Sequence, residues 1–204
     1  MDSDDISFVT KIEKQVALIS SNSDIDVVGA GMCFLDKDDN PIGHWHAPEN
    51  HDQICKRPYR SLNIAHGTVL GKKSWFLKNP YNEKIPYAVD FDLFLRSYSN
   101  SLFANVKEPL YFYRFDDSFN LKKQLIDRCV SSKFLFNHYY KLGRFDKAVL
   151  NYCMQYGKLA ATLIIFTLGL RKFMMSRRFE TINDMQRNIY IQEIKKIKNI
   201  EIPI

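Results

Sequence analysis

The sequence predicts an α/β domain followed by an α-helical C-terminal region. Over the first 120 residues, short apolar runs typical of strands alternate with helical patterns, and turn-forming residues separate them. From Leu121 onward the apolar residues recur at helical spacing, and no proline occurs before Pro203. A change of charge at the same place supports the division.

The two parts differ in charge, although the whole chain has a net charge of +6. Residues 1–120 hold 13 basic and 17 acidic side chains, whereas residues 121–204 hold 16 basic and 6 acidic ones. A basic tail can contact a nucleic acid, a membrane surface or an acidic partner, and a solvated helix surface would look the same. We expect domains at 1–118 and 119–204.

The first part predicts several elements in order. Residues 6–20 predict a helix with Ser7 as its N-cap and with Ile12, Val16 and Ile19 on one face. A hairpin is expected next, because "KDDNP" is a turn cluster between two strand patterns. The remaining expectations are a strand and short helix over residues 63–79, a helix that begins just after Asp90, and a strand over residues 102–115.

The second part predicts three helices. The first ends at Gly143, the second is long and has candidate breaks at Gly157 and Gly169, and the third covers residues 183–202. The run Leu159–Leu170 is apolar but too short to span a bilayer, which takes about 20 residues. It predicts either a core helix or a peripheral membrane contact through residues 159–178, where basic residues flank it.

Two groups of residues could hold a metal ion. Asp2, Asp4 and Asp5 offer the oxygen ligands that Mg²⁺ or Mn²⁺ prefers, although acids before a helix also favour its positive end. His44 and His46 are alternate residues of one strand, but no third ligand has fitting spacing, so a surface hairpin is favoured there.

The four cysteines are widely spaced and form no C-x-x-C pair. This usage is typical of free thiols in a cytosolic protein and argues against a disulfide framework. We expect a cytoplasmic protein, with the inner face of the cell membrane as the alternative site suggested by the tail.

The segment from Asp2 to about Arg114 resembles the second half of a family 2 glycosyltransferase of the GT-A type, a Rossmann-like fold. "DSD" resembles the DxD motif, "AHGTVL" the segment below the acceptor site, "YAVDFDLFLR" the acidic motif and "YFYR" the strand that closes the site. Val89 stands where the family usually has glutamate, and Phe115 and Asp116 follow where many members have a histidine nearby.

The resemblance implies a role for each matching residue. Asp90 would be the general base, because an inverting transferase needs a base within reach of the acceptor hydroxyl. A divalent ion, Mn²⁺ or Mg²⁺, would neutralise the leaving diphosphate. The implied metal ligands are Asp2, Asp4 and Asp5, and the implied substrate-binding residues are His66, Gly67, Asp92, Tyr113 and Arg114.

The implied activity is transfer of a sugar, with inversion, from a nucleotide-sugar donor to a glycan or lipid-linked acceptor, with no nucleic-acid partner. The strands that normally precede the DxD motif are not in the sequence, so we expect a partial GT-A domain that lacks the nucleotide-binding half and is inactive alone. The alternative is a non-catalytic remnant that binds a partner or a membrane.

Overall fold

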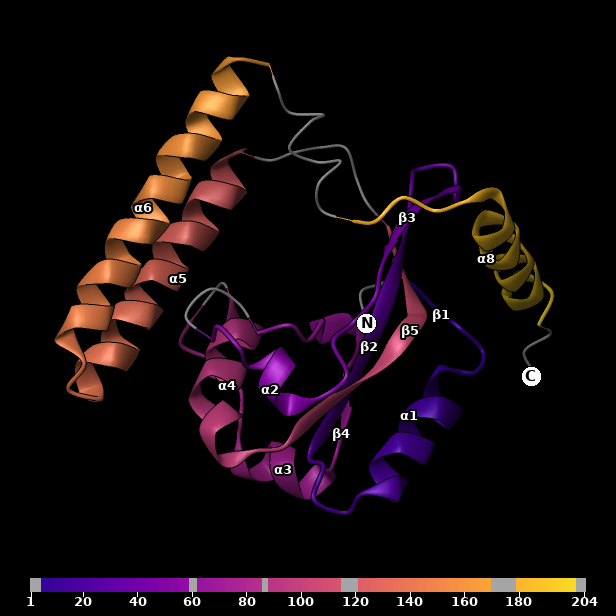
Figure 1. The fold of residues 1–204 in the computed structure, drawn as a ribbon, viewed down its shortest axis with the longest axis horizontal. Coiled ribbons are helices and arrows are strands. Elements are labelled where there is room, and N and C mark those ends of the chain that lie inside the picture. Colours follow the sequence, from indigo (N-terminus) through magenta and orange to yellow (C-terminus); the bar gives the residue numbers. More distant parts are fainter. Residues whose placement is uncertain (1–4, 59–61, 86–87, 115–120, 170–178, 201–204) are drawn as a thin grey trace.

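The computed structural model describes residues 5–58, 62–85, 88–114, 121–169 and 179–200. Its centre is a mixed sheet with strand order β1-β5-β2-β3, and β4 pairs with β2 beside this path (Figure 1). Only the β2–β5 pair is parallel among the described strands. The strands are β1 (Ile6–Ser7), β2 (Val27–Leu35), β3 (Pro41–Trp45), β4 (Leu70–Gly71) and β5 (Phe103–Arg114).

Short helices cover one end of this sheet and enclose the main core. Trp75, Leu93 and Phe103 pack there with Val27 and Ile54, all of them buried. The elements concerned are α2 (His51–Ile54), the 3₁₀ turn η1 (His66–Thr68), α3 (Lys73–Lys78), α4 (Val89–Ser97) and the 3₁₀ turn η2 (Tyr98–Asn100), while α1 (Lys11–Ser21) lies against β2 and β5.

The C-terminal region consists of a helical hairpin and a separate helix. Helices α5 (Leu121–Lys141) and α6 (Phe145–Thr167) pack side by side and project away from the sheet (Figure 1). Gly143, with φ of +69°, makes the turn between them, as expected. Helix α8 (Asp184–Lys198) begins with a capping box formed by Asn183 and Gln186 and returns to the sheet. The α/β fold with a helical C-terminal region is therefore confirmed.

Strands β2 and β5 present different residues to their two faces, because side chains alternate along a strand. Cys33, Leu35 and Phe112 face the side covered by Tyr190 and Ile194 of α8. The alternate residues of the same strands line a cavity on the opposite side. Helix α8 thus supports, from behind, the strands that form the candidate site.

The expectation for the first helix was wrong in two respects. Ile6–Ser7 forms β1 and pairs with β5, and the helix begins at Lys11 after Thr10, so Ser7 is not its N-cap. Ile12 and Val16 are 57% and 45% exposed, whereas Lys11 and Gln15 are buried. The Gln15 side chain faces inward because its Nε2 donates to the carbonyls of Val28 and Thr68, at 3.1 and 2.7 Å.

The apolar run near the end of α6 does not form a core helix over its described residues. Leu163, Ile164, Phe166 and Leu168 are all exposed, between 38% and 65%. Within the described ranges, no helix combines the length and the apolar character that crossing a membrane requires. Gly157 lies inside α6 without interrupting it, and Gly169 follows its end with φ of +68°.

Candidate active site

A cavity of about 300 Å³ lies on the face of β2 and β5 that α8 does not cover. Its lining brings together five of the site residues expected from the sequence, which come from four separate segments of the chain. The lining residues are Asp5, Met32, Phe34, Ala65, His66, Gly67, Asp90, Tyr111 and Tyr113.

Strand alternation builds one side of the cavity. Met32 and Phe34 are two apart on β2, Tyr111 and Tyr113 are two apart on β5, and Phe34 is directly opposite Tyr113 in the parallel pair. The Phe34 and Tyr113 rings meet edge to face with centroids 6.0 Å apart. An aromatic surface of this kind suits the apolar face of a flat or ring-shaped ligand.

Asp90 faces the cavity from the first turn of α4. The helix begins at Val89, so Asp90 is inside it rather than just before it, and Ala88 precedes it in the left-handed region with φ of +54°. A carboxylate in the first turn of a helix is stabilised by the unpaired backbone N–H groups there. The start of the helix therefore holds a negative charge at the cavity.

Asp5 is oriented by two hydrogen bonds from β5. The Tyr111 hydroxyl donates to its Oδ2 at 2.8 Å, and the backbone N–H of Arg114 donates to its Oδ1 at 3.0 Å. The Arg114 guanidinium itself pairs with Asp39, with Nη1 and Oδ1 at 2.6 Å. Arg114 thus contacts the candidate site through its backbone and the β2–β3 turn through its side chain.

His66 and Tyr81 form a polar pair beside Asp90. His66 Nε2 and the Tyr81 hydroxyl are 2.9 Å apart, and the two rings meet edge to face. Burial raises the pKa of Tyr81, and the negative charge of Asp90 raises it further. The phenol therefore stays protonated near neutral pH and can donate a hydrogen bond.

Gly67 allows the Tyr111 ring to reach Asp5. A β-carbon at position 67 would lie 2.8 Å from the Tyr111 hydroxyl oxygen, too close for an undisturbed structure. Lys11 contacts both residues, because its Nζ lies 3.5 Å from the Gly67 carbonyl oxygen and 5.3 Å from the centroid of the Tyr111 ring. Burial lowers the pKa of Lys11.

Four residues expected at the site are not among those that line this cavity, and Arg114, described above, is one of them. Asp92 is buried and accepts a hydrogen bond from Arg96 Nε at 2.8 Å, and it lines a separate cavity beside His138. Asp2 and Asp4 lie outside the described residues. The carboxylates at Asp5 and Asp90 are therefore the acidic groups that the described chain places at the cavity.

Three residues of this region were not among those expected from the sequence: Tyr111, Tyr81 and Lys11. Tyr111 could have been found, because it is two residues before Tyr113 on a strand and must share its face. Tyr81 lies in a loop without a repeating pattern, and Lys11 reads as a solvated charge on an amphipathic helix. Neither position carries a signal before the fold is known.

Comparison with known proteins supports a relationship to one class, the glycosyltransferases. The chain is 28% identical over 131 residues to an uncharacterized glycosyltransferase of Methanocaldococcus jannaschii, in an alignment that covers 61% of this chain and 45% of the relative. It is 31% identical over 134 residues to the O-antigen biosynthesis glycosyltransferase WbnJ of Escherichia coli. That alignment covers 61% of this chain and 50% of the relative. The chain spans about half the length of the curated relatives it matches. No family model matches it.

Proposed function

We propose that this chain forms the acceptor-side part of a glycosyltransferase that moves a sugar from a nucleotide-sugar donor to a glycan or lipid-linked acceptor with inversion. The observation that carries the proposal is the single cavity at which Asp5, His66, Gly67, Asp90 and Tyr113 meet. These residues come from distant parts of the chain, and both named relatives are glycosyltransferases.

Asp90 is the general base in this proposal. Inverting transfer needs a group that removes the proton from the acceptor hydroxyl as that oxygen attacks the sugar carbon. The Asp90 carboxylate opens into the cavity, and the neighbouring Tyr81 and His66 are suited to orient a hydroxyl-rich acceptor. Tyr113, 40% exposed at the same cavity, offers a ring on which a sugar can pack.

The acidic residues at the start of the sequence, Asp2, Asp4 and Asp5, offer the oxygen ligands that a hard divalent cation prefers. Mg²⁺ and Mn²⁺ commonly bind through one or two carboxylates together with phosphate oxygens. Asp5 is the described member of this group, and its two hydrogen bonds leave further lone pairs on both oxygens for a metal or its water. When bound, the ion would neutralise charge on the leaving diphosphate, and Tyr111 would keep Asp5 in place.

The experiment is transfer by the complete protein as its gene encodes it, measured with a panel of nucleotide-sugars and Mn²⁺. Asp90→Asn should lower kcat by about 10²–10⁴-fold and leave the KM for the donor nearly unchanged, because general-base catalysis contributes about that factor. Asp24→Asn, at an exposed position after α1, is the matched control.

Activity of Asp90→Asn within a few-fold of the wild type would show that Asp90 is not the base. The absence of transfer by the wild type with every donor in the panel would count against the proposed class of reaction.

A further inference from the structure

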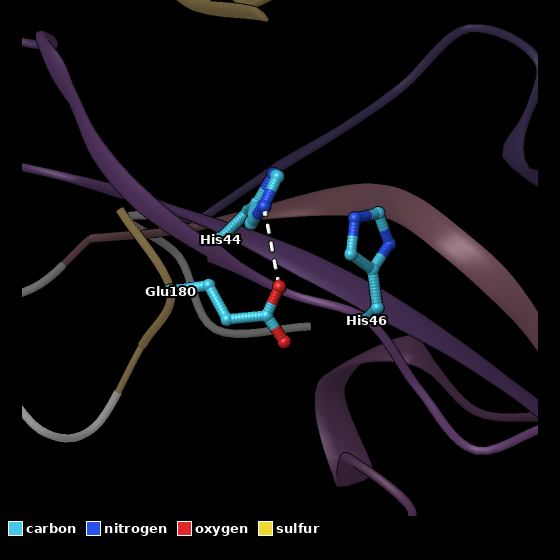
Figure 2. A group of neighbouring side chains, drawn as sticks. All are labelled: His44, His46 and Glu180. Carbon is cyan, nitrogen blue, oxygen red and sulfur yellow. Dashed lines mark ion pairs between the residues drawn. The ribbon is translucent and has the colours of Figure 1, made fainter. Parts of the chain in front are cut away.

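The edge strand β3 and the segment before α8 bring together two histidines and one carboxylate, none of which lines the cavity of the candidate site. His44 and His46 are alternate residues at the end of β3, and Glu180 lies beside them (Figure 2). An isolated antiparallel β-bridge holds His44 and Glu180 side by side. The His44 N–H donates to the Glu180 carbonyl at 3.0 Å, and the Glu180 N–H donates to the His44 carbonyl at 2.8 Å. The backbone therefore holds Glu180 against β3 whether or not a ligand is present.

The three side chains face one another with spacings close to those of a metal centre. His44 Nε2 and Glu180 Oε2 are 3.6 Å apart, and one ligand atom from each residue lies within 4.8 Å of the others. Bonds of about 2.0–2.1 Å to a tetrahedral Zn²⁺ separate ligand atoms by about 3.3 Å. Glu180 is 61% exposed at its side chain, so its carboxylate has room to rotate toward a bound ion.

His44 is oriented as metal-bound histidines usually are. Its side chain is 3% exposed, and its Nδ1 lies 2.7 Å from the hydroxyl of Tyr190 on α8. When Nδ1–H donates to this oxygen, the lone pair of Nε2 is directed toward Glu180 and is free to bind a metal.

His46 turns its Nε2 toward His44 and Glu180, and its Nδ1 lies on the other side of the ring (Figure 2). Its Nδ1 is buried and has no hydrogen-bond partner within the described part of the chain. The centroids of the His44 and His46 rings are 4.4 Å apart. The Nε2 of His46, rather than this Nδ1, is therefore the atom available to an ion shared with His44 and Glu180.

We propose that His44, His46 and Glu180 bind one Zn²⁺ ion, with water completing the coordination, and that this ion fastens α8 to the edge of the sheet. Two imidazoles and one carboxylate are ligands that zinc accepts readily, whereas Mg²⁺ prefers an all-oxygen set. The role is structural, because the ion would join β3 to the segment that leads into α8. Without a metal, His44 Nε2 and Glu180 Oε2 remain 3.6 Å apart.

The test is calorimetric titration of the chelator-stripped chain with ZnCl₂, with millimolar Mg²⁺ present to occupy hard oxygen sites such as Asp5. We expect one high-affinity Zn²⁺ per chain and a rise in the unfolding temperature. Glu180→Gln keeps the backbone bridge and should weaken binding at least tenfold and abolish most of the thermal shift. Glu83→Gln, at an exposed loop position, should behave as the wild type.

Two further variants separate ligation from folding. His46→Gln removes a ligand whose Nδ1 has no partner to lose, and it should reproduce the Glu180→Gln result. Tyr190→Phe removes only the positioning hydroxyl and should weaken Zn²⁺ binding about 10–100-fold. Equal Zn²⁺ affinity in the wild type and the Glu180→Gln variant, or no high-affinity site in the wild type, would overturn the proposal.

Discussion

Tyr111 joins three features of the candidate site through one side chain. Its hydroxyl donates to Asp5, its ring occupies the space that the missing side chain of Gly67 leaves, and Lys11 lies over its face. The residue is 1% exposed, so each contact is made in a poorly hydrated environment, where a hydrogen bond to a charge is strong. The position of Asp5 therefore depends on a residue that is almost fully buried.

Tyr111→Phe should lower the free energy of unfolding by about 1.5 kcal/mol, because it removes a hydrogen bond to a charged acceptor without changing the ring. The variant should also bind Mn²⁺ more weakly if Asp5 contributes to a metal site. Urea denaturation gives the first quantity and calorimetry the second. Tyr140→Phe, at a side chain 61% exposed on α5, is the control and should change neither.

At the scale of elements, one carboxylate connects three secondary-structure ends. Asp39 lies in the β2–β3 turn with φ of +63°. Its Oδ1 pairs with Arg114 at the end of β5, and its Oδ2 lies 2.8 Å from Lys198 Nζ at the end of α8. The Lys198 contact and then the Arg114 contact hold the pKa of Asp39 below its usual value, against the opposing effect of burial. This turn therefore helps to keep α8 docked.

Asp39→Asn should cost about 0.5–1 kcal/mol of stability at pH 7, the range for partly exposed ion pairs. Asparagine tolerates the left-handed backbone, so the charge is what changes. Folding lowers the pKa of Asp39, so its ion pairs contribute their full stability above the pKa that Asp39 has in the unfolded chain. That stability is lost as the pH falls through the lower pKa of the folded state. The stability difference between the variant and the wild type should thus shrink as pH falls below the ordinary range of an aspartate carboxyl.

Urea denaturation at pH 7 and in acid measures the stability difference between Asp39→Asn and the wild type. Asp38→Asn, at the exposed neighbouring position, is the control. A difference between Asp39→Asn and the wild type that persists unchanged in acid would show that the ion pairs are not its cause.

Local patterns predicted the elements whose structure is decided locally. The hairpin of β2 and β3, the end of α5 near Gly143 and the amphipathic α8 all have turn, cap or periodicity signals in their own residues. By contrast, β1 exists because Ile6 pairs with Phe112, and the inward face of α1 is set by carbonyls that Gln15 reaches in other segments. Such pairings have no trace in the local sequence.

The candidate site shows the same division. The family resemblance pointed to Asp5, His66, Gly67, Asp90 and Tyr113, which the fold brings to one cavity. Asp92 matched the same motif, but its helical position directs it to Arg96. Glu180 could not be found, because its nearness to His44 results from a backbone bridge between distant segments.

In the whole molecule, the α5–α6 hairpin presents an exposed apolar surface at the end of α6 that lies away from the Gly143 turn. Ile164, Phe166 and Leu168 are exposed there, and the sequence that follows contains Arg171 and Lys172. Apolar side chains next to basic ones suit the surface of an anionic membrane. A membrane contact at this point would suit a lipid-linked acceptor.

We predict that the chain co-sediments with vesicles containing anionic lipid and that high salt weakens the binding. The double variant Ile164→Glu and Leu168→Glu should release it, because both side chains would lose their apolar contact with the lipid. Leu77→Glu, at a position 73% exposed on α3, is the matched control. Equal sedimentation with neutral and anionic vesicles would contradict the electrostatic part, and no sedimentation would contradict the whole prediction.

Strands β2 and β5 line the cavity with one face and pack against α8 with the other. This arrangement can link ligand binding in the cavity to the docking of α8. One set of ladder hydrogen bonds positions Phe34 and Tyr113 at the cavity and Cys33 and Phe112 against α8. A ligand that binds only the ordered pair of strands must also favour the state in which α8 is docked, and release of α8 must weaken that ligand by the same factor. A ligand in the cavity and the docked helix α8 would in this way be coupled through the thickness of a single sheet.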